Sequence, residues 1–93
     1  MGSYKMQKEK DLKVRTKKFA LRIIKMYSSL PKTKEAKVMG PQVLRSGTSV
    51  GAKYREASRG RSKAEFVAKM GECLKELDET IYWLVSIISS FVC

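Results

Sequence analysis

The residues that could do chemistry are concentrated between positions 44 and 66, in LRSGTSVGAKYREASRGRSKAEF. The glycines and lysine of Gly47–Tyr54 suggest a phosphate-binding loop of the GxxxxGK[ST] type. The segment departs from that motif at Ala52, where the second glycine belongs, and at Tyr54, where the magnesium-binding Ser or Thr belongs. No strand is expected before it, and the segment itself is predicted to be helical. The sequence therefore argues against a nucleotide-binding loop.

Catalysis finds no better support in these residues. The sequence contains no histidine, so Ser46 and Ser49 have no imidazole to activate them, and nothing suggests that Lys53 is a base for Ser49. Cys73 and Cys93, the only cysteines, are too few for a zinc site or a disulfide framework. We therefore expect a protein that is not an enzyme and has no cofactor or metal.

The sequence predicts a cytoplasmic protein. Its first residues, MGSYKMQKEKDLK, contain no apolar run of the kind found in secretory signals. The apolar stretch Ile81–Cys93 is too short to cross a bilayer as a helix. The scarcity of cysteine fits a reducing compartment.

The formal net charge is +11, and it is unevenly distributed. Residues 1–37 hold twelve bases against three acids, residues 38–63 six against one, and residues 64–93 two against five. A basic front and a mildly acidic end suggest that the first two thirds bind a polyanion. The alternative is an ordinary solvated, lysine-rich surface.

Arginines near the end of the central stretch are the best candidates for phosphate contacts, because a guanidinium can bind phosphate in a bidentate way. The structural alternative is ion pairing with Glu56 or Glu65. Tyr54, Tyr82 and Trp83 could stack on bases, although such aromatic residues on helices are more often in a core. The predicted nucleic-acid-binding residues are Lys17, Lys18, Arg22, Lys25, Arg45, Lys53, Arg55, Arg59, Arg61 and Lys63.

Three helices must position these residues within a single domain, residues 1–93. Residues 1–10 are polar and predicted to be disordered. Apolar residues spaced by three and four predict a first helix over about residues 11–29, which Leu30-Pro31 stops. Thr33 is a plausible N-cap of a second helix that ends near Ser58. Pro41 should kink this helix or begin a new one.

The third helix should begin after Ser62, which forms a capping box with Glu65. Val67, Met70, Leu74, Leu77, Ile81, Leu84, Ile88 and Phe91 alternate spacings of three and four. This stripe predicts a helix that is packed along its length. Further apolar residues on other sides of the helix suggest contacts with other copies of the chain. The residues expected at helix or subunit contacts are Gly47, Gly51, Tyr54, Ile81, Trp83, Leu84 and Ile88.

Several blocks of sequence closely resemble the bacterial 23S rRNA-intervening-sequence protein family, also called four-helix-bundle proteins. The blocks are FALRII, LPKTKEA, LRSGTSVGA, YREA, RSKAEF and LKELDETIYWL, all within residues 16–84. The family positions that carry over are Arg45, Ser46, Ser49, Tyr54, Arg55, Glu56, Arg61, Ser62, Lys63 and Glu65.

The resemblance implies an antiparallel up-down four-helix bundle that assembles as a homopentameric ring. It also implies an association with the 23S rRNA intervening sequence and RNA binding, whereas related accessory proteins of retroelements bind a reverse transcriptase. Lys53 replaces a family asparagine, and Pro41 replaces a long polar residue. The family continues into a fourth helix where this sequence ends at Val85–Cys93, so the fourth helix is expected to be truncated.

These observations predict an all-α protein that binds RNA without catalysis, as a homo-oligomer and without a membrane or a small-molecule substrate. Two alternatives stay open. One is an adaptor that binds a reverse transcriptase or another enzyme, and the other is a truncated product without retained activity. Binding of RNA that depends on salt would distinguish an RNA-binding protein from an adaptor.

Overall fold

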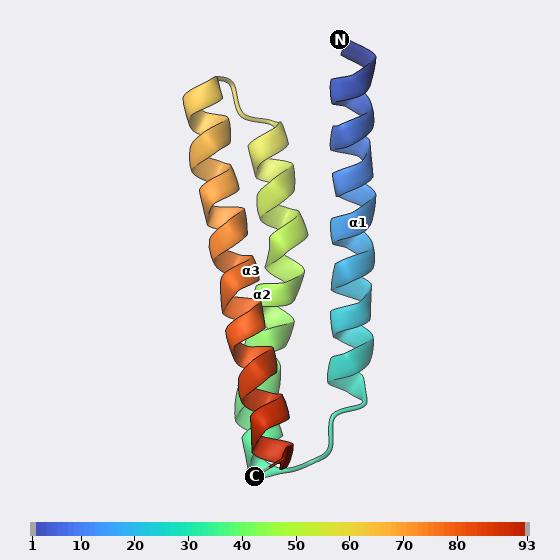
Figure 1. Ribbon diagram of the computed structural model, residues 1–93, viewed down its shortest axis with the longest axis vertical. Coiled ribbons are helices and arrows are strands. Elements are labelled where there is room, and N and C mark those ends of the chain that lie inside the picture. The colour runs from blue at the N-terminus through green and yellow to red at the C-terminus, as the bar shows by residue number, and fades with distance from the viewer. Residues whose placement is uncertain (1, 93) are drawn as a thin grey trace.

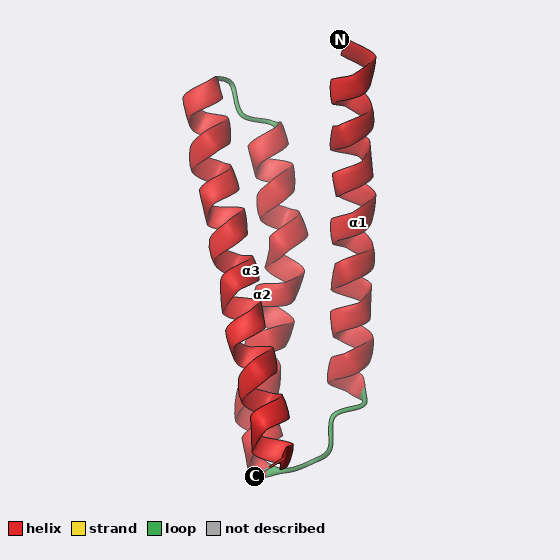
Figure 2. Ribbon diagram, viewed as in Figure 1, coloured by secondary structure: helices red, strands yellow, loops and turns green. Residues whose placement is uncertain are grey.

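The computed structural model describes residues 2–92, with side chains from Lys10 onward, and this part of the chain forms three helices without a strand. These are α1 (Gly2–Ser28), α2 (Lys34–Ser58) and α3 (Lys63–Val92). They run antiparallel in an elongated bundle of 50 × 21 × 17 Å (Figures 1 and 2). α1 and α3 both pack on α2. The all-α class is thus confirmed, and a fourth helix does not occur within residues 2–92.

α1 is longer than the sequence predicts. It begins at Gly2, so helix occupies the stretch where disorder is expected. The segment contains Lys, Met, Gln and Glu, which are good helix formers, and it has no proline that would end the helix. The helix ends at Ser28, close to the expected stop at Leu30-Pro31. Met1 lies outside the described residues.

α2 begins as predicted and continues where a break was possible. The Thr33 hydroxyl oxygen accepts a hydrogen bond from the Ala36 N–H at 3.1 Å, so Thr33 is the N-cap. Pro41 lies inside one continuous helix, and the idea that a new helix begins there is wrong. Pro41 is exposed, so the Lys37 carbonyl that loses its helical partner can bond to water.

The turn between α2 and α3 carries the predicted capping interactions in a modified form. The Ser62 hydroxyl oxygen accepts a hydrogen bond from the Glu65 N–H at 3.1 Å. The Glu65 carboxylate accepts a hydrogen bond from the Arg61 N–H, also at 3.1 Å. Arg61 is the residue before the cap. The two bonds fix the start of α3 and the path of the chain that enters it.

The core consists of two apolar clusters centred on α2. One contains Ile23, Val43 and Ile87, one residue from each helix. The other contains Val50, Tyr54 and Cys73, with Phe19 packed against both clusters. Fully buried Ser46 and Thr80 join α2 to α3.

The predicted stripe on α3 is only partly packed. Val67, Leu74, Ile81 and Ile88, which recur every seven residues, are between 51% and 59% exposed. The buried residues of α3 are instead Cys73, Thr80 and Ile87, each one position earlier in the heptad. The prediction that the whole stripe is packed is therefore wrong, because α2 covers α3 from one side only.

The space around two helical glycines predicts how each responds to substitution. A Cβ on Gly47 would lie 2.9 Å from two carbons of Ile23, whereas a Cβ on Gly71 would meet nothing within 4 Å. Gly71→Ala should raise the free energy of unfolding by about 0.5–1 kcal/mol, the usual gain for an exposed helix position. Gly47→Ala carries the same gain but also an overpacking cost of about 1–3 kcal/mol, so it should be the less stable variant. Urea unfolding followed by circular dichroism measures both, and an equal gain would show that Gly47 is not a tight contact.

Candidate nucleic-acid interface

A basic groove runs between α1 and α2. Lys13 and Lys17 of α1 face Arg55 and Arg59 of α2 across two adjoining hollows of about 300 and 140 Å³. Lys13 and Arg55 line both hollows. Each pair of bases is four residues apart and therefore lies on one side of its helix. We name these four residues the basic quartet.

Small residues explain why the two helices bring the quartet together. A Cβ on Gly51 would lie 3.2 Å from the Thr16 hydroxyl oxygen, so the two backbones are close at this level. Ala20 and Ala52 also line the larger hollow. Leu21 and Ile24 of α1 line the same hollow, so the basic side chains lie beside an apolar lining.

The groove is electrostatically uncompensated. None of the described residues that line the two hollows is acidic. No member of the quartet takes part in an ion pair among the residues whose side chains are described. Four cations from two helices thus face solvent together, an arrangement that attracts a polyanion such as a nucleic-acid backbone.

Two further predicted residues lie next to the groove, at the turn. Arg61 and Lys63 line a separate hollow of about 480 Å³ together with Phe66. The side chains of both bases are exposed. They extend the basic surface from the end of α2 across the turn to the first residue of α3.

Three of the predicted bases on α1 lie outside this groove. Lys18 and Arg22 line a different groove, which also contains Leu77 of α3. Lys25 is exposed and lines neither groove. The bases of α1 therefore belong to at least two faces, which the sequence did not separate. Lys13, which belongs to the quartet, was not among the predicted binding residues.

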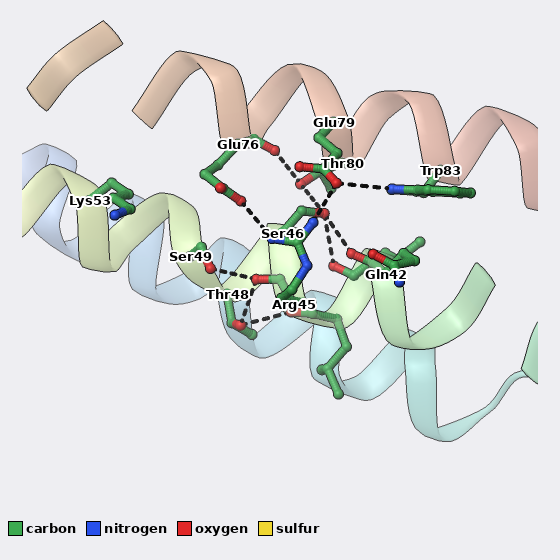
Figure 3. A network of polar contacts seen from close by, with 12 residues as sticks. Gln42, Arg45, Ser46, Thr48, Ser49, Lys53, Glu76, Glu79, Thr80 and Trp83 are labelled. Atoms are coloured by element: carbon green, nitrogen blue, oxygen red, sulfur yellow. Dashed lines mark hydrogen bonds and ion pairs between the residues drawn. The ribbon is translucent and has the colours of Figure 1, made fainter. Parts of the chain in front are cut away.

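Arg45 and Lys53 are engaged in ion pairs within the bundle. Arg45 reaches across to α3, where Nη1 lies 3.4 Å from Glu76 Oε2 and Nη2 pairs with Glu79 Oε1 (Figure 3). Lys53 Nζ lies 3.6 Å from Glu56 Oε2. Arg45 thus holds α2 to α3, and its charge is already compensated.

The hydroxyls of the central stretch are structural. Ser46 donates to the Gln42 carbonyl at 2.8 Å, and Ser49 donates to the Arg45 carbonyl at 2.6 Å. The Thr80 hydroxyl lies 2.9 Å from Ser46 Oγ and 2.8 Å from the Glu76 carbonyl (Figure 3). These bonds satisfy the buried polar groups at the contact between α2 and α3. None of them prepares a nucleophile.

The three aromatic residues that were predicted to stack on bases lie in different surroundings. Tyr54 is buried in the core, and Trp83 is half-buried, with its Nε1–H 3.4 Å from Glu79 Oε1. Tyr82 is exposed and packs edge-on against Trp83. None of the three lines the groove of the quartet.

The residues predicted at helix or subunit contacts occupy different environments. Gly47 and Gly51 lie where α2 meets α1. Leu84 is half-buried beside the first core cluster. Ile81 and Ile88 are exposed.

The structure offers no alternative site of metal or thiol chemistry among its described residues. No three acidic or cysteine side chains in that part of the chain come together as metal ligands. Cys73 is a free, buried thiol 3.3 Å from the Val50 carbonyl, and burial raises the pKa of the Cys73 thiol. Cys93 lies outside the described residues. No described helix is both long and apolar enough to cross a membrane.

The fold and its surface define a small, basic, all-helical protein. The chain belongs to the 23S rRNA-intervening sequence protein family, whose model matches residues 8–90. It is also similar to a solved protein of unknown function from the S23 ribosomal protein family of Bacteroides thetaiotaomicron. The two share 41% identity with a TM-score of 0.83, over 92% of this chain and 77% of the other. No curated protein matches the sequence.

The different surroundings of Arg45 and Arg55 predict opposite effects of the same substitution. Arg45→Gln removes the partner of two glutamates, and because the side chain is half-exposed it should cost no more than about 1 kcal/mol of stability. RNA affinity should change little. Arg55→Gln should leave stability unchanged and, if the groove binds single-stranded RNA, lower the slope of RNA affinity against salt by about 0.7. Thermal melts and filter binding measure the two properties, and equal loss of RNA affinity would show that Arg45 also contacts phosphate.

Proposed function

We propose that this protein binds RNA through the basic quartet, extended by Arg61 and Lys63, and that it does so without catalysis. The observation that carries the proposal is the convergence of four bases without an acidic partner along their groove. The family's name supports an RNA from the 23S rRNA context as the ligand.

The arrangement favours recognition of the backbone over recognition of bases. Lysine and arginine side chains at a groove rim can contact successive phosphates. The described groove presents no aromatic side chain on which an RNA base could stack. The protein should therefore bind with strong salt dependence and little sequence preference of its own.

Removal of the two lysines of the quartet tests this proposal. Lys13→Gln with Lys17→Gln should weaken RNA binding and lower the salt slope by about 0.7 for each lost contact to a single strand. The matched control is Lys34→Gln with Lys37→Gln, which removes the same charge at the other end of the bundle, where both lysines are exposed. Filter binding over a salt series gives the slopes. Equal slopes for the two double variants would show that binding depends only on net charge. That result would reject the basic quartet as the RNA-binding site.

We also propose that copies of the chain associate through the end of α3, and that the assembly is the pentameric ring implied by the resemblance. Tyr82, Val85 and Val92 are 64%, 56% and 80% exposed on that part of the helix. Each large apolar side chain left in water forgoes about 1.5–3 kcal/mol of burial. Association of copies would recover part of that free energy.

A matched pair of valine substitutions tests the association. Val85→Glu places a charge in the proposed contact and should lower the mass in solution toward that of one chain. Val38→Glu makes the same change at the start of α2, at a valine that is 69% exposed against 56% for Val85, and should leave the mass unchanged. Light scattering after size exclusion reports the masses. A parent protein that is monomeric at micromolar concentration would overturn the proposed assembly.

A further inference from the structure

The hollow at the turn between α2 and α3 contains an aromatic side chain that the bundle leaves partly uncovered. Phe66 lines this hollow of about 480 Å³ and is 38% exposed. A volume of this size lies within the range of sites for small ligands. Figure 1 shows the turn at one end of the bundle, away from the C-terminal end of α3.

Phe66 lies on the side of α3 that faces α2. Cys73, Thr80 and Ile87 follow it at intervals of seven residues, and these three are at most 6% exposed. The last turn of α2 contributes Ala57 to the hollow beside Phe66. A single methyl group cannot cover an aromatic ring. The exposure of Phe66 therefore has a local cause, the small residue at the end of α2.

The turn holds the backbone of Phe66 in place. The Phe66 N–H donates a hydrogen bond to the Ser62 carbonyl at 3.0 Å. A Cβ on Gly60 would lie 3.2 Å from the Phe66 nitrogen, so the chain that enters α3 packs directly against this residue. An aromatic side chain on a fixed backbone has little conformational freedom to lose when it binds a ligand.

Two basic side chains lie beside Phe66. Arg61 and Lys63 line the same hollow, are exposed, and take part in no ion pair among the residues whose side chains are described. The described lining contains no acidic side chain. Ser58 lines both this hollow and the groove of the basic quartet, so the basic surface continues from the groove to Phe66.

We propose that Phe66 stacks on an unpaired nucleobase of the bound RNA, while Arg61 and Lys63 contact the neighbouring phosphates. The inference rests on the proposed RNA binding and adds a preference for unpaired nucleotides, which phosphate contacts alone do not give. Proteins that bind single strands combine aromatic rings with cationic side chains in this way. A nucleobase within a duplex is covered on both faces by its neighbours, so it has no free face for Phe66. Stacking accepts every nucleobase, which fits binding with little sequence preference.

The affinities for two RNAs test the stacking. Phe66→Leu keeps an apolar side chain but removes the ring, so it should weaken binding of an unstructured single-stranded RNA by at least about fivefold. Binding of a fully paired RNA of the same length should stay as in the parent. Because no charge is removed, the salt slope should also stay unchanged. Equal loss of affinity for both RNAs in filter binding, or loss for neither, would overturn the proposal.

Two control variants separate the ring from other effects of the substitution. Phe66→Tyr retains the ring and should bind the single strand as the parent does. Phe91→Leu makes the leucine substitution at the other end of α3, where the phenylalanine is 49% exposed, and should also leave the affinity unchanged. A loss of affinity in either control as large as that of Phe66→Leu would overturn the proposal.

Photocrosslinking of the parent protein locates the contact without a substitution, so it is decisive even if Phe66→Leu does not fold. A single-stranded RNA with iodouridine in place of uridine forms crosslinks to aromatic rings that stack on it. Mass spectrometry of the digested complex should find the crosslink at Phe66. Crosslinks found only at other aromatic residues would overturn the proposal.

The proposed function and the stacking site can fail separately. If Lys13→Gln with Lys17→Gln lowers the salt slope while Phe66→Leu leaves the affinity unchanged, only the stacking site is rejected. If Phe66→Leu weakens binding of the single strand while the lysine variant keeps the parent's slope, only the quartet is rejected. A parent that binds no RNA would reject both. A lower mass of Phe66→Leu in light scattering would place Phe66 in a contact between copies and overturn the stacking.

Discussion

The close approach of α2 to both of its neighbours is the constraint on which the rest of the structure depends. Two adjacent small residues of α2, Ser46 and Gly47, permit this close approach. Gly47 has no side chain, so Ile23 of α1 packs directly on its backbone. Ser46, the residue before it, is fully buried against Thr80 of α3. A larger residue at either position would separate the helices, because an overpacked contact displaces neighbouring side chains and backbone. The central stretch thus resembles a phosphate loop in composition, but its small residues serve helix packing.

This constraint also determines which bases are available to a ligand. α2 presents Arg45 toward α3, where Glu76 and Glu79 compensate its charge. Arg55 and Arg59, further along α2, line the groove toward α1, where they meet lysines. The arginines therefore differ in their surroundings according to the helix that they face, although they belong to one continuous basic stretch. A paired arginine stabilises the bundle modestly, whereas an unpaired cluster attracts anions.

The sequence predicted the features that depend on local chemistry. The cap at Thr33 and the capping box at Ser62 involve residues only three positions apart, so a short segment contains all the information. The buried side of α3 was not predictable in the same way. Its residues are apolar on several sides, and periodicity cannot tell which side meets α2. The ion pairs of Arg45 were not predictable for the same reason, because its partners Glu76 and Glu79 lie more than thirty residues away and become neighbours only when α2 packs on α3.

The lysines of α1 show why net charge alone cannot identify a ligand. Lys17 and Lys18 are adjacent in sequence, yet a helix turns about 100° per residue, so they line different grooves. Both grooves also hold large apolar side chains, Leu21 and Ile24 beside Lys17 and Phe19 and Leu77 beside Lys18, so the two grooves differ in the bases that α2 contributes. Around Lys17 the groove holds further bases from α2, which suits a flexible chain of phosphates. Around Lys18 the bases that line the groove, Arg15, Lys18 and Arg22, all come from α1. Adjacent lysines of one helix therefore belong to different surfaces, a division that the net charge does not show.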